Sequence, residues 1–105
     1  MRVVLASMNE IGRQGLEELV KHVEVVGLLT PMERGNHYMD LTDFAEVTER
    51  LGVPLHRIDD VNSQETEELV RSLRPDLGIS LGWKKIIKER VFGIPPLGWI
   101  GAHPG

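Results

Sequence analysis

The chain has 105 residues, of which 41% are hydrophobic and 27% are charged, which predicts one globular domain over residues 1–105 and argues against disorder. The absence of cysteine excludes disulfide scaffolds, thiolate zinc sites and cysteine nucleophiles. A formal net charge of -4 and the lack of a long apolar run argue against direct binding of nucleic acid or of a membrane, and favour a cytoplasmic protein.

Strand-like and helix-like segments alternate along the chain. The aliphatic runs that predict strands are, in chain order, residues 3–6, 23–29, 53–58, 77–81 and 97–102. Helical spacing of apolar residues begins after residue 10, near residue 42, at residue 62 or 63, and at residue 84. Short apolar strands separated by helices are typical of a parallel sheet covered on both faces. The sequence therefore predicts an α/β, three-layer, Rossmann-like fold with a largely parallel sheet of about five strands.

Turn and cap residues mark the limits of these elements. Polar residues over 32–40 indicate a loop, and Gly52 is a natural C-terminal stop for the helix that begins near Thr42. Asn62 or Ser63 caps the following helix, with a glutamate in capping-box spacing after Asn62. The segment 84–92 is predicted to be a short helix.

Ligands of such sheets bind at the carboxyl ends of the strands, where the strand order reverses. The first of these turns, residues 7–12, has one glycine, so it carries neither a dinucleotide fingerprint nor a phosphate-binding P-loop. We interpret it as an ordinary turn capped by Asn9, with anion binding at the helix N-terminus as the alternative. Trp83 is expected at the rim of a ligand pocket, and Trp99 in the core.

The stretch from Arg74 to Gly105 is the most informative part of the sequence. It contains Arg-Pro-Asp, a strand that ends at Gly-Trp, the pair Ile-Ile, the approach Ile-Pro-Pro-Leu-Gly and a strand that ends at His-Pro. Together with the segments MRVVLAS, VVGLLT and LGVPLHRI, these motifs resemble the folate-dependent formyltransferases, the family of the methionyl-tRNA and sugar formyltransferases. The resemblance covers essentially the whole chain.

This resemblance implies a cofactor and a reaction. The family transfers a formyl group from 10-formyltetrahydrofolate to an amine, so a reduced folate and an amine acceptor, methionyl-tRNA or an amino sugar, are the expected partners. By the same resemblance, the pterin ring of the folate contacts the loop after the fourth strand, and the catalytic histidine follows the fifth strand. The cofactor-binding residues implied here are Gly82, Trp83, Lys84, Lys85, Ile86 and Ile87, and the catalytic residue is His103.

Two departures from the family pattern bear on activity. Gly101 stands where the family has an asparagine, and glycine has no side-chain donor for the developing oxyanion. The catalytic aspartate of the family lies further along its sequence than residue 105. We therefore expect the chain to be the N-terminal, truncated part of a formyltransferase-type domain, and to show no formyl transfer by itself.

Two other functions stay open. The chain could be a non-catalytic ligand-binding or dimerising module, with a homodimer protecting the apolar fifth strand, or a generic dinucleotide-binding domain. The basic cluster of Lys84, Lys85, Lys88 and Arg90 is predicted to be a solvated helix face, with an anion-contacting rim as the alternative. No metal site is expected, because the histidines and aspartates of residues 37–43 and 56–60 match no ligand spacing.

Overall fold

The computed structural model describes residues 1–32 and 42–102. The predicted loop 32–40 falls almost entirely outside the described residues, and the predicted catalytic His103 also lies outside them. No helix within the described ranges is long and apolar enough to cross a membrane.

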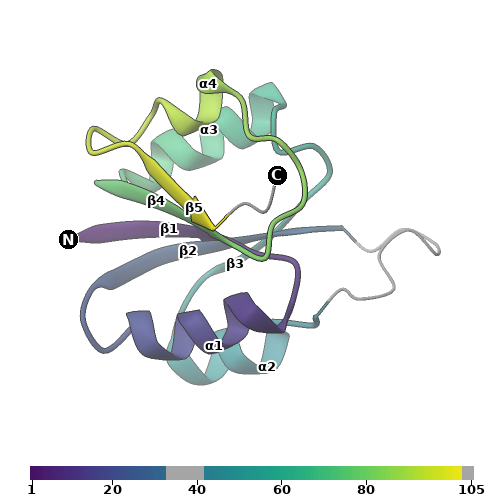
Figure 1. Ribbon diagram of the computed structural model, residues 1–105, viewed down its shortest axis with the longest axis vertical. Coiled ribbons are helices and arrows are strands. Elements are labelled where there is room, and N and C mark those ends of the chain that lie inside the picture. Colours follow the sequence, from purple (N-terminus) through teal and green to yellow (C-terminus); the bar gives the residue numbers. More distant parts are fainter. Residues whose placement is uncertain (33–41, 103–105) are drawn as a thin grey trace.

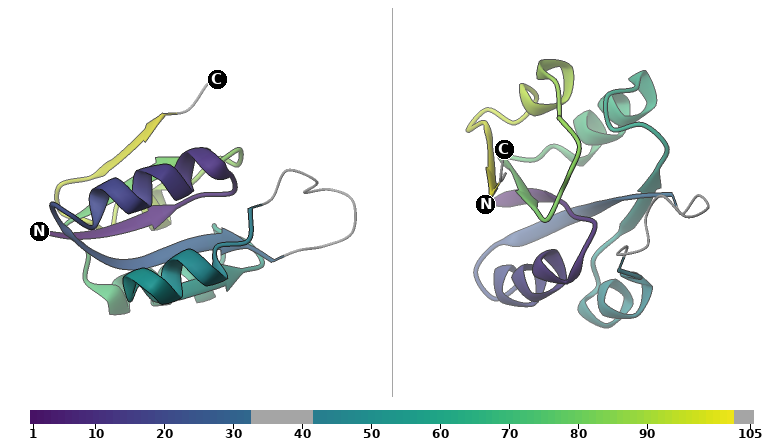
Figure 2. Two further views of the ribbon diagram at one scale, coloured as in Figure 1. Left: turned by 90° about the horizontal axis from the view of Figure 1, so that it is seen from below. Right: turned by 45° about the vertical axis from the view of Figure 1, so that its right-hand side comes forward.

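The described residues form a sheet of five parallel strands in the order β3-β2-β1-β4-β5. The strands are β1 (Arg2–Ala6), β2 (Glu24–Pro31), β3 (Leu55–Ile58), β4 (Leu77–Leu81) and β5 (Trp99–Ala102). The helices are α1 (Glu10–Leu19), α2 (Ala45–Leu51), α3 (Gln64–Leu73) and α4 (Glu89–Phe92). Helices α1 and α2 cover one face of the sheet, while α3 and α4 cover the other (Figure 1; Figure 2, right). The predicted three-layer α/β fold with a parallel sheet of about five strands is confirmed.

Successive side chains of β1, the central strand, alternate between the two buried clusters that form the core. Ala6 packs in one buried cluster with Val70 of α3, whereas its neighbour Leu5 packs in the other with Leu16 of α1. All four side chains are fully buried. Successive side chains of a strand point to opposite faces, so an apolar run such as β1 serves both helix layers. Burial of each large aliphatic side chain contributes about 1.5–3 kcal/mol, which stabilises the sandwich of layers.

The predicted caps are confirmed at two helix starts. The Asn9 side chain accepts a hydrogen bond from the Ile11 amide at 3.1 Å and begins α1. Of the two candidates for α3, Ser63 is the N-cap, because its hydroxyl oxygen accepts from the Thr66 amide at 3.2 Å. Each cap satisfies an amide at the helix start that has no partner within the helix.

Several predicted boundaries were wrong. Strand β2 continues to Pro31 rather than ending at residue 29, and β3 begins at Leu55 rather than at residue 53. Helix α2 begins at Ala45 rather than near Thr42, since Asp43 accepts a side-chain hydrogen bond from the Ala45 amide just before the first turn. Strand β5 begins at Trp99 rather than at residue 97, because Gly98 turns the chain with a positive φ of 89°. The predicted helix 84–92 is helical only over α4, and residues 84–88 form an irregular loop.

Candidate functional site at the β1–β4 switch point

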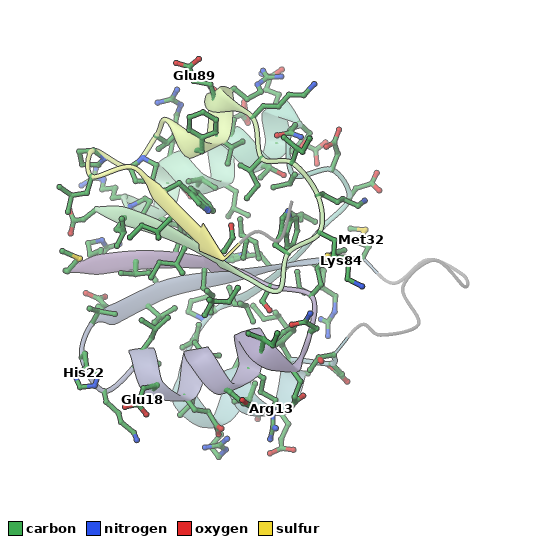
Figure 3. The ribbon with its side chains drawn as sticks, viewed as in Figure 1. Arg13, Glu18, His22, Met32, Lys84 and Glu89 are labelled. Carbon is green, nitrogen blue, oxygen red and sulfur yellow. The ribbon has the colours of Figure 1, made fainter. Side chains whose placement is uncertain are left out.

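The strand order reverses between β1 and β4, so the turn after β1 and the loop after β4 meet at the carboxyl edge of the sheet. The Met8 amide donates to the Gly82 carbonyl at 3.1 Å. The Lys84 amide, in turn, lies 3.2 Å from the Met8 sulfur, a weak acceptor. Figure 3 shows Lys84 at the same edge of the sheet as Met32, the residue that follows β2. The switch point is where doubly wound sheets bind ligands.

Gly82 is required at this junction by its backbone and by its surroundings. Its φ is +63°, in the left-handed region that costs other L-residues free energy. A Cβ atom added here would lie 1.9 Å from Oδ1 of Asn9, the cap of α1. The close approach of the two turns therefore depends on the missing side chain of Gly82.

The sequence led us to expect Trp83 at the rim of a pocket, but the structure buries it in the core. Its side chain is only 3% exposed and belongs to the core cluster on the α3 and α4 face, with Val91 of α4. Its indole Nε1 is buried, and no hydrogen-bond partner is found for it among the described residues. The loop after β4 runs towards α4 (Figure 1), and Trp83 packs in the half of the core that α3 and α4 cover.

A cavity of about 310 Å³ lies next to Trp83, between β4, β5 and α4. Its walls come from all three elements and from the loop after β4, and they are mostly aromatic or aliphatic: Ser80, Trp83, Lys85, Ile87, Phe92, Trp99 and Gly101. A mainly apolar cavity with a few polar groups is the usual form of a small-molecule site. Three of the predicted cofactor-binding residues, Trp83, Lys85 and Ile87, thus line one cavity.

Trp99 both packs in the core and lines this cavity, so the prediction of core packing alone was incomplete. Its Nε1 donates to the Ser80 hydroxyl at 2.6 Å. Its ring lies over Gly78, where an added Cβ would approach it to 2.2 Å. Sequence reasoning did not identify Ser80 or Phe92 as wall residues. A signal was available for Ser80, because Gly78 and Ser80 alternate along β4 and must face the same side.

Residues 84–86 of the loop after β4 are exposed to solvent, although Lys85 also borders the cavity. Lys84, Lys85 and Ile86 are exposed, and Ile86 retains 73% of its accessible surface. The prediction that the basic cluster covers a helix face was wrong for the three lysines, since they lie on the loop that precedes α4. Lys85 is the member of this cluster that is among the residues lining the cavity.

The end of β5 lies beside the start of this loop. Ala102 pairs with Leu81 across the parallel β4–β5 ladder, one residue before Gly82. Gly101 pairs with Ser80 and borders the cavity, and a Cβ added at Gly101 would lie 3.3 Å from the Cβ of Ser80. A side chain at position 101 would therefore enter a tight space. His103 is outside the described residues, so its predicted catalytic role stays a prediction.

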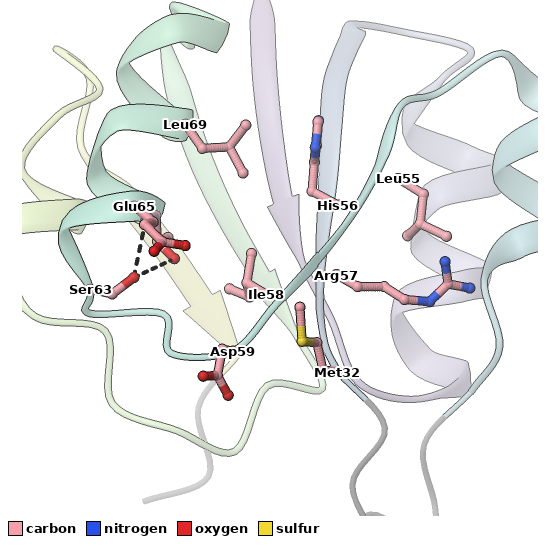
Figure 4. A pocket seen from close by; sticks show the side chains of 10 residues that line it. Met32, Leu55, His56, Arg57, Ile58, Asp59, Ser63, Glu65 and Leu69 are labelled. Atoms are coloured by element: carbon pink, nitrogen blue, oxygen red, sulfur yellow. Dashed lines mark hydrogen bonds between the residues drawn. The ribbon is translucent and has the colours of Figure 1, made fainter.

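A second cavity, of about 340 Å³, lies at the opposite edge of the sheet, between β3 and α3 (Figure 4). His56 reaches into it from β3, and its Nε2 is buried without a partner among the described residues. Burial lowers the pKa of His56. This cavity shares no residue with the first, and the described residues contain no group of three side chains that could hold a metal ion.

Comparison with known proteins identifies relatives along essentially the entire chain. A methionyl-tRNA formyltransferase of Thermotoga maritima is 35% identical over 109 residues, which cover 99% of this chain and 34% of the relative. That of Kosmotoga olearia is 31% identical over 108 residues, covering 98% of this chain and 34% of the relative. The chain is homologous to the N-terminal third of these methionyl-tRNA formyltransferases. No model of a known protein family matches it.

The chain thus spans about a third of the length of its curated formyltransferase relatives. The family resemblance seen in the motifs of residues 74–105 is confirmed by this homology. The cavity between β4, β5 and α4 lies in the part of the formyltransferase sequence that the match covers.

Proposed function

We propose that this chain supplies the folate-binding part of a formyl-transfer site, with 10-formyltetrahydrofolate as the donor and an amine as the acceptor. The observation that carries the proposal is the cavity between β4, β5 and α4, in a chain homologous to methionyl-tRNA formyltransferases. Its walls combine Trp83 and Ile87 from the loop after β4 with Trp99 from β5. Flat aromatic and apolar walls suit a pterin ring, and Lys85 at the mouth suits the carboxylates of a folate tail.

The reaction needs two kinds of help from the protein. The acceptor nitrogen attacks the formyl carbon, and negative charge develops on the formyl oxygen of a tetrahedral intermediate. The bond from that carbon to N10 of the folate then breaks, the amine loses a proton and N10 gains one. In our proposal His103 exchanges this proton or donates to the oxyanion, because imidazole titrates near neutral pH.

Gly101 limits the activity expected of this chain. The family asparagine at this position would donate to the oxyanion, and glycine leaves that role unfilled. Loss of one such donor lowers rates on the order of 100- to 1000-fold. We therefore propose that the 105-residue chain binds reduced folate but transfers no formyl group above background.

The test is isothermal titration calorimetry of the chain with tetrahydrofolate in anaerobic buffer, in parallel with NAD. Saturable heat with tetrahydrofolate and none with NAD supports the proposal, whereas the reverse pattern would support a dinucleotide-binding domain. Incubation with 10-formyltetrahydrofolate and methionyl-tRNA, or an amino-sugar nucleotide, then tests transfer directly. Enzymatic formylation of either acceptor would contradict the proposed inactivity.

A dimerising module is the second candidate, and the outer edge of β5 favours it. Ile100 of β5 is 60% exposed and Leu97 just before it is 62% exposed. Exposed apolar edge strands promote pairing with another chain. Sedimentation equilibrium separates the two functions, because a dimer that binds no tetrahydrofolate would replace the folate proposal.

A further inference from the structure

The loop between β4 and α4 is fastened to the rest of the molecule by side chains far away in sequence. At its beginning, the Lys84 amide contacts the sulfur of Met8. At its end, the side chain of Asn62 makes two hydrogen bonds to the loop backbone. Its Nδ2 donates to the Ile86 carbonyl at 2.9 Å, and its Oδ1 accepts from the Lys88 amide at 2.7 Å. Both distances are those of well-formed bonds.

The two bonds enclose a single residue, Ile87. In an extended segment, the carbonyl of one residue and the amide of the second residue after it point to the same side. Asn62 therefore pairs with the loop as one residue of a neighbouring strand would. Because successive side chains point in opposite directions along such a segment, this pairing fixes the orientation of both isoleucines.

The two isoleucines have different environments. Ile87 is half-buried, packs against the core cluster that contains Trp83, and lines the cavity. Ile86 is 73% exposed and is not among the residues that line the cavity. A shift of the loop by one residue would exchange the two isoleucines, so that Ile86 would face the cavity and Ile87 would face the solvent.

The backbone of Asn62 is itself held in place, which preorganises its side-chain amide. The backbone amide of Asn62 donates to Oδ1 of Asp60 at 2.9 Å, and the backbone carbonyl of Asn62 accepts from Arg90 of α4 at 3.4 Å. Arg90 also donates to Glu67 of α3 at 2.9 Å. These contacts fix the backbone of Asn62 between α3 and α4 before its side chain reaches the loop.

We infer that Asn62 is a positioning residue for the cavity: its side-chain amide sets the register of residues 86–88, so that Ile87 rather than Ile86 forms the wall. The identity of the ligand rests on the proposed function, whereas the effect on loop register does not. An aspartate could accept from Lys88 but would place a second oxygen against the Ile86 carbonyl, so it should preserve only half of the pairing.

The experiment compares the full chain with its Asn62→Ala and Asn62→Asp variants. The control is Gln64→Ala, which removes an amide of the same helix start that bonds Glu68 instead of the loop. Amide hydrogen exchange measured by NMR reports the Lys88 bond. Ile87 packs against the core cluster that contains Trp83, so we expect a nuclear Overhauser contact between the Ile87 methyls and the Trp83 ring, and this contact reports the register. Calorimetry with tetrahydrofolate reports the cavity.

In Asn62→Ala we expect the Lys88 amide to exchange about tenfold faster, as for loss of one net hydrogen bond. The Ile87–Trp83 contact should weaken and tetrahydrofolate should bind about tenfold less tightly. Asn62→Asp should keep the Lys88 amide protected but lose the contact and the affinity, and Gln64→Ala should match the wild type in all three measurements.

Unchanged Lys88 exchange and an unchanged Ile87–Trp83 contact in Asn62→Ala would overturn the inference, as would a freed loop that binds tetrahydrofolate with wild-type affinity. Should Asn62→Ala fail to fold, the Ile87–Trp83 contact in Asn62→Asp decides: its loss supports the inference, and a wild-type contact overturns it. A wild-type chain that binds no tetrahydrofolate refutes the proposed function instead, and the two NMR measurements then decide the role of Asn62 independently.

Discussion

Replacing Gly82 with alanine measures how closely the two turns of the switch point approach each other. Gly82 has a φ of +63°, and a left-handed conformation costs a residue with a Cβ about 1–2 kcal/mol. The new methyl group would also meet Oδ1 of Asn9 at 1.9 Å, so the asparagine side chain must move away and give up its cap of α1. Loss of such a cap costs about 1 kcal/mol. The expected loss in the free energy of unfolding is therefore roughly 2–3 kcal/mol, a large part of the ~5–15 kcal/mol typical of a whole domain.

Gly52 provides a matched control. Its φ is +71°, nearly the same as that of Gly82, but a Cβ added there meets nothing within 4 Å. Gly52→Ala should therefore show the backbone strain alone, about 1–2 kcal/mol. The difference between the two variants isolates the contact with Asn9.

The double variant Asn9→Ala, Gly82→Ala makes the test sharper. Asn9→Ala alone should cost about 1 kcal/mol through the lost cap. With the asparagine already absent, the second substitution adds only the backbone strain, so the double variant should fall short of the sum by about 1 kcal/mol. Urea unfolding followed by tryptophan fluorescence gives all four values, since a change in midpoint at constant slope reports stability. Equal losses in Gly52→Ala and Gly82→Ala, or strict additivity in the double variant, would refute the steric reasoning.

Two further predictions concern buried polar groups. Burial lowers the pKa of His56 in the folded chain. In the unfolded chain a histidine titrates near pH 6.5, so the unfolded chain takes up the proton first as the pH falls. The free energy of unfolding should therefore decrease from pH 7.5 to pH 5. His56→Gln should remove this part of the pH dependence in urea titrations at the two pH values, with the exposed His22→Gln as control, and an unchanged slope would contradict the burial argument. Trp99→Phe removes the 2.6 Å bond to Ser80 and leaves a buried hydroxyl unpaired, at a cost of about 1–3 kcal/mol. The same substitution in a Ser80→Ala background should cost less, and equal costs in both backgrounds, measured by thermal unfolding, would speak against the bond.

Much of the fold was predictable because its signals are local. Aliphatic runs separated by helical spacing indicated the parallel sheet, and a polar residue before a helical segment identified the cap Asn9 and narrowed the cap of α3 to Asn62 or Ser63. The rule that ligands bind at the carboxyl ends of such strands then directed attention to Gly82 and the residues after it. The resemblance to formyltransferases rested on short motifs, and the homology bears it out.

The details of the cavity were not predictable in the same way. The residues around Gly82 and Trp83 gave no local sign that Trp83 is buried in the core, so it was expected at the rim of a pocket. The helical spacing over 84–92 was genuine, but hydrogen bonds from Asn62 hold Ile86 and Lys88 in a non-helical form. Local propensity is a weak preference, and tertiary contacts of this kind override it.

The amino-acid sequence by itself determined the order of strands and helices and the cap of α1. Only the tertiary structure decided that Ser63 rather than Asn62 is the cap of α3, that Trp83 is buried, that Ile87 rather than Ile86 lines the cavity, and that Asn62 bonds the loop on both sides of Ile87. The physical reason is distance along the chain: Asn62 bonds a carbonyl 24 residues away. Such a contact forms only once the crossover from α3 through β4 has brought the two segments together.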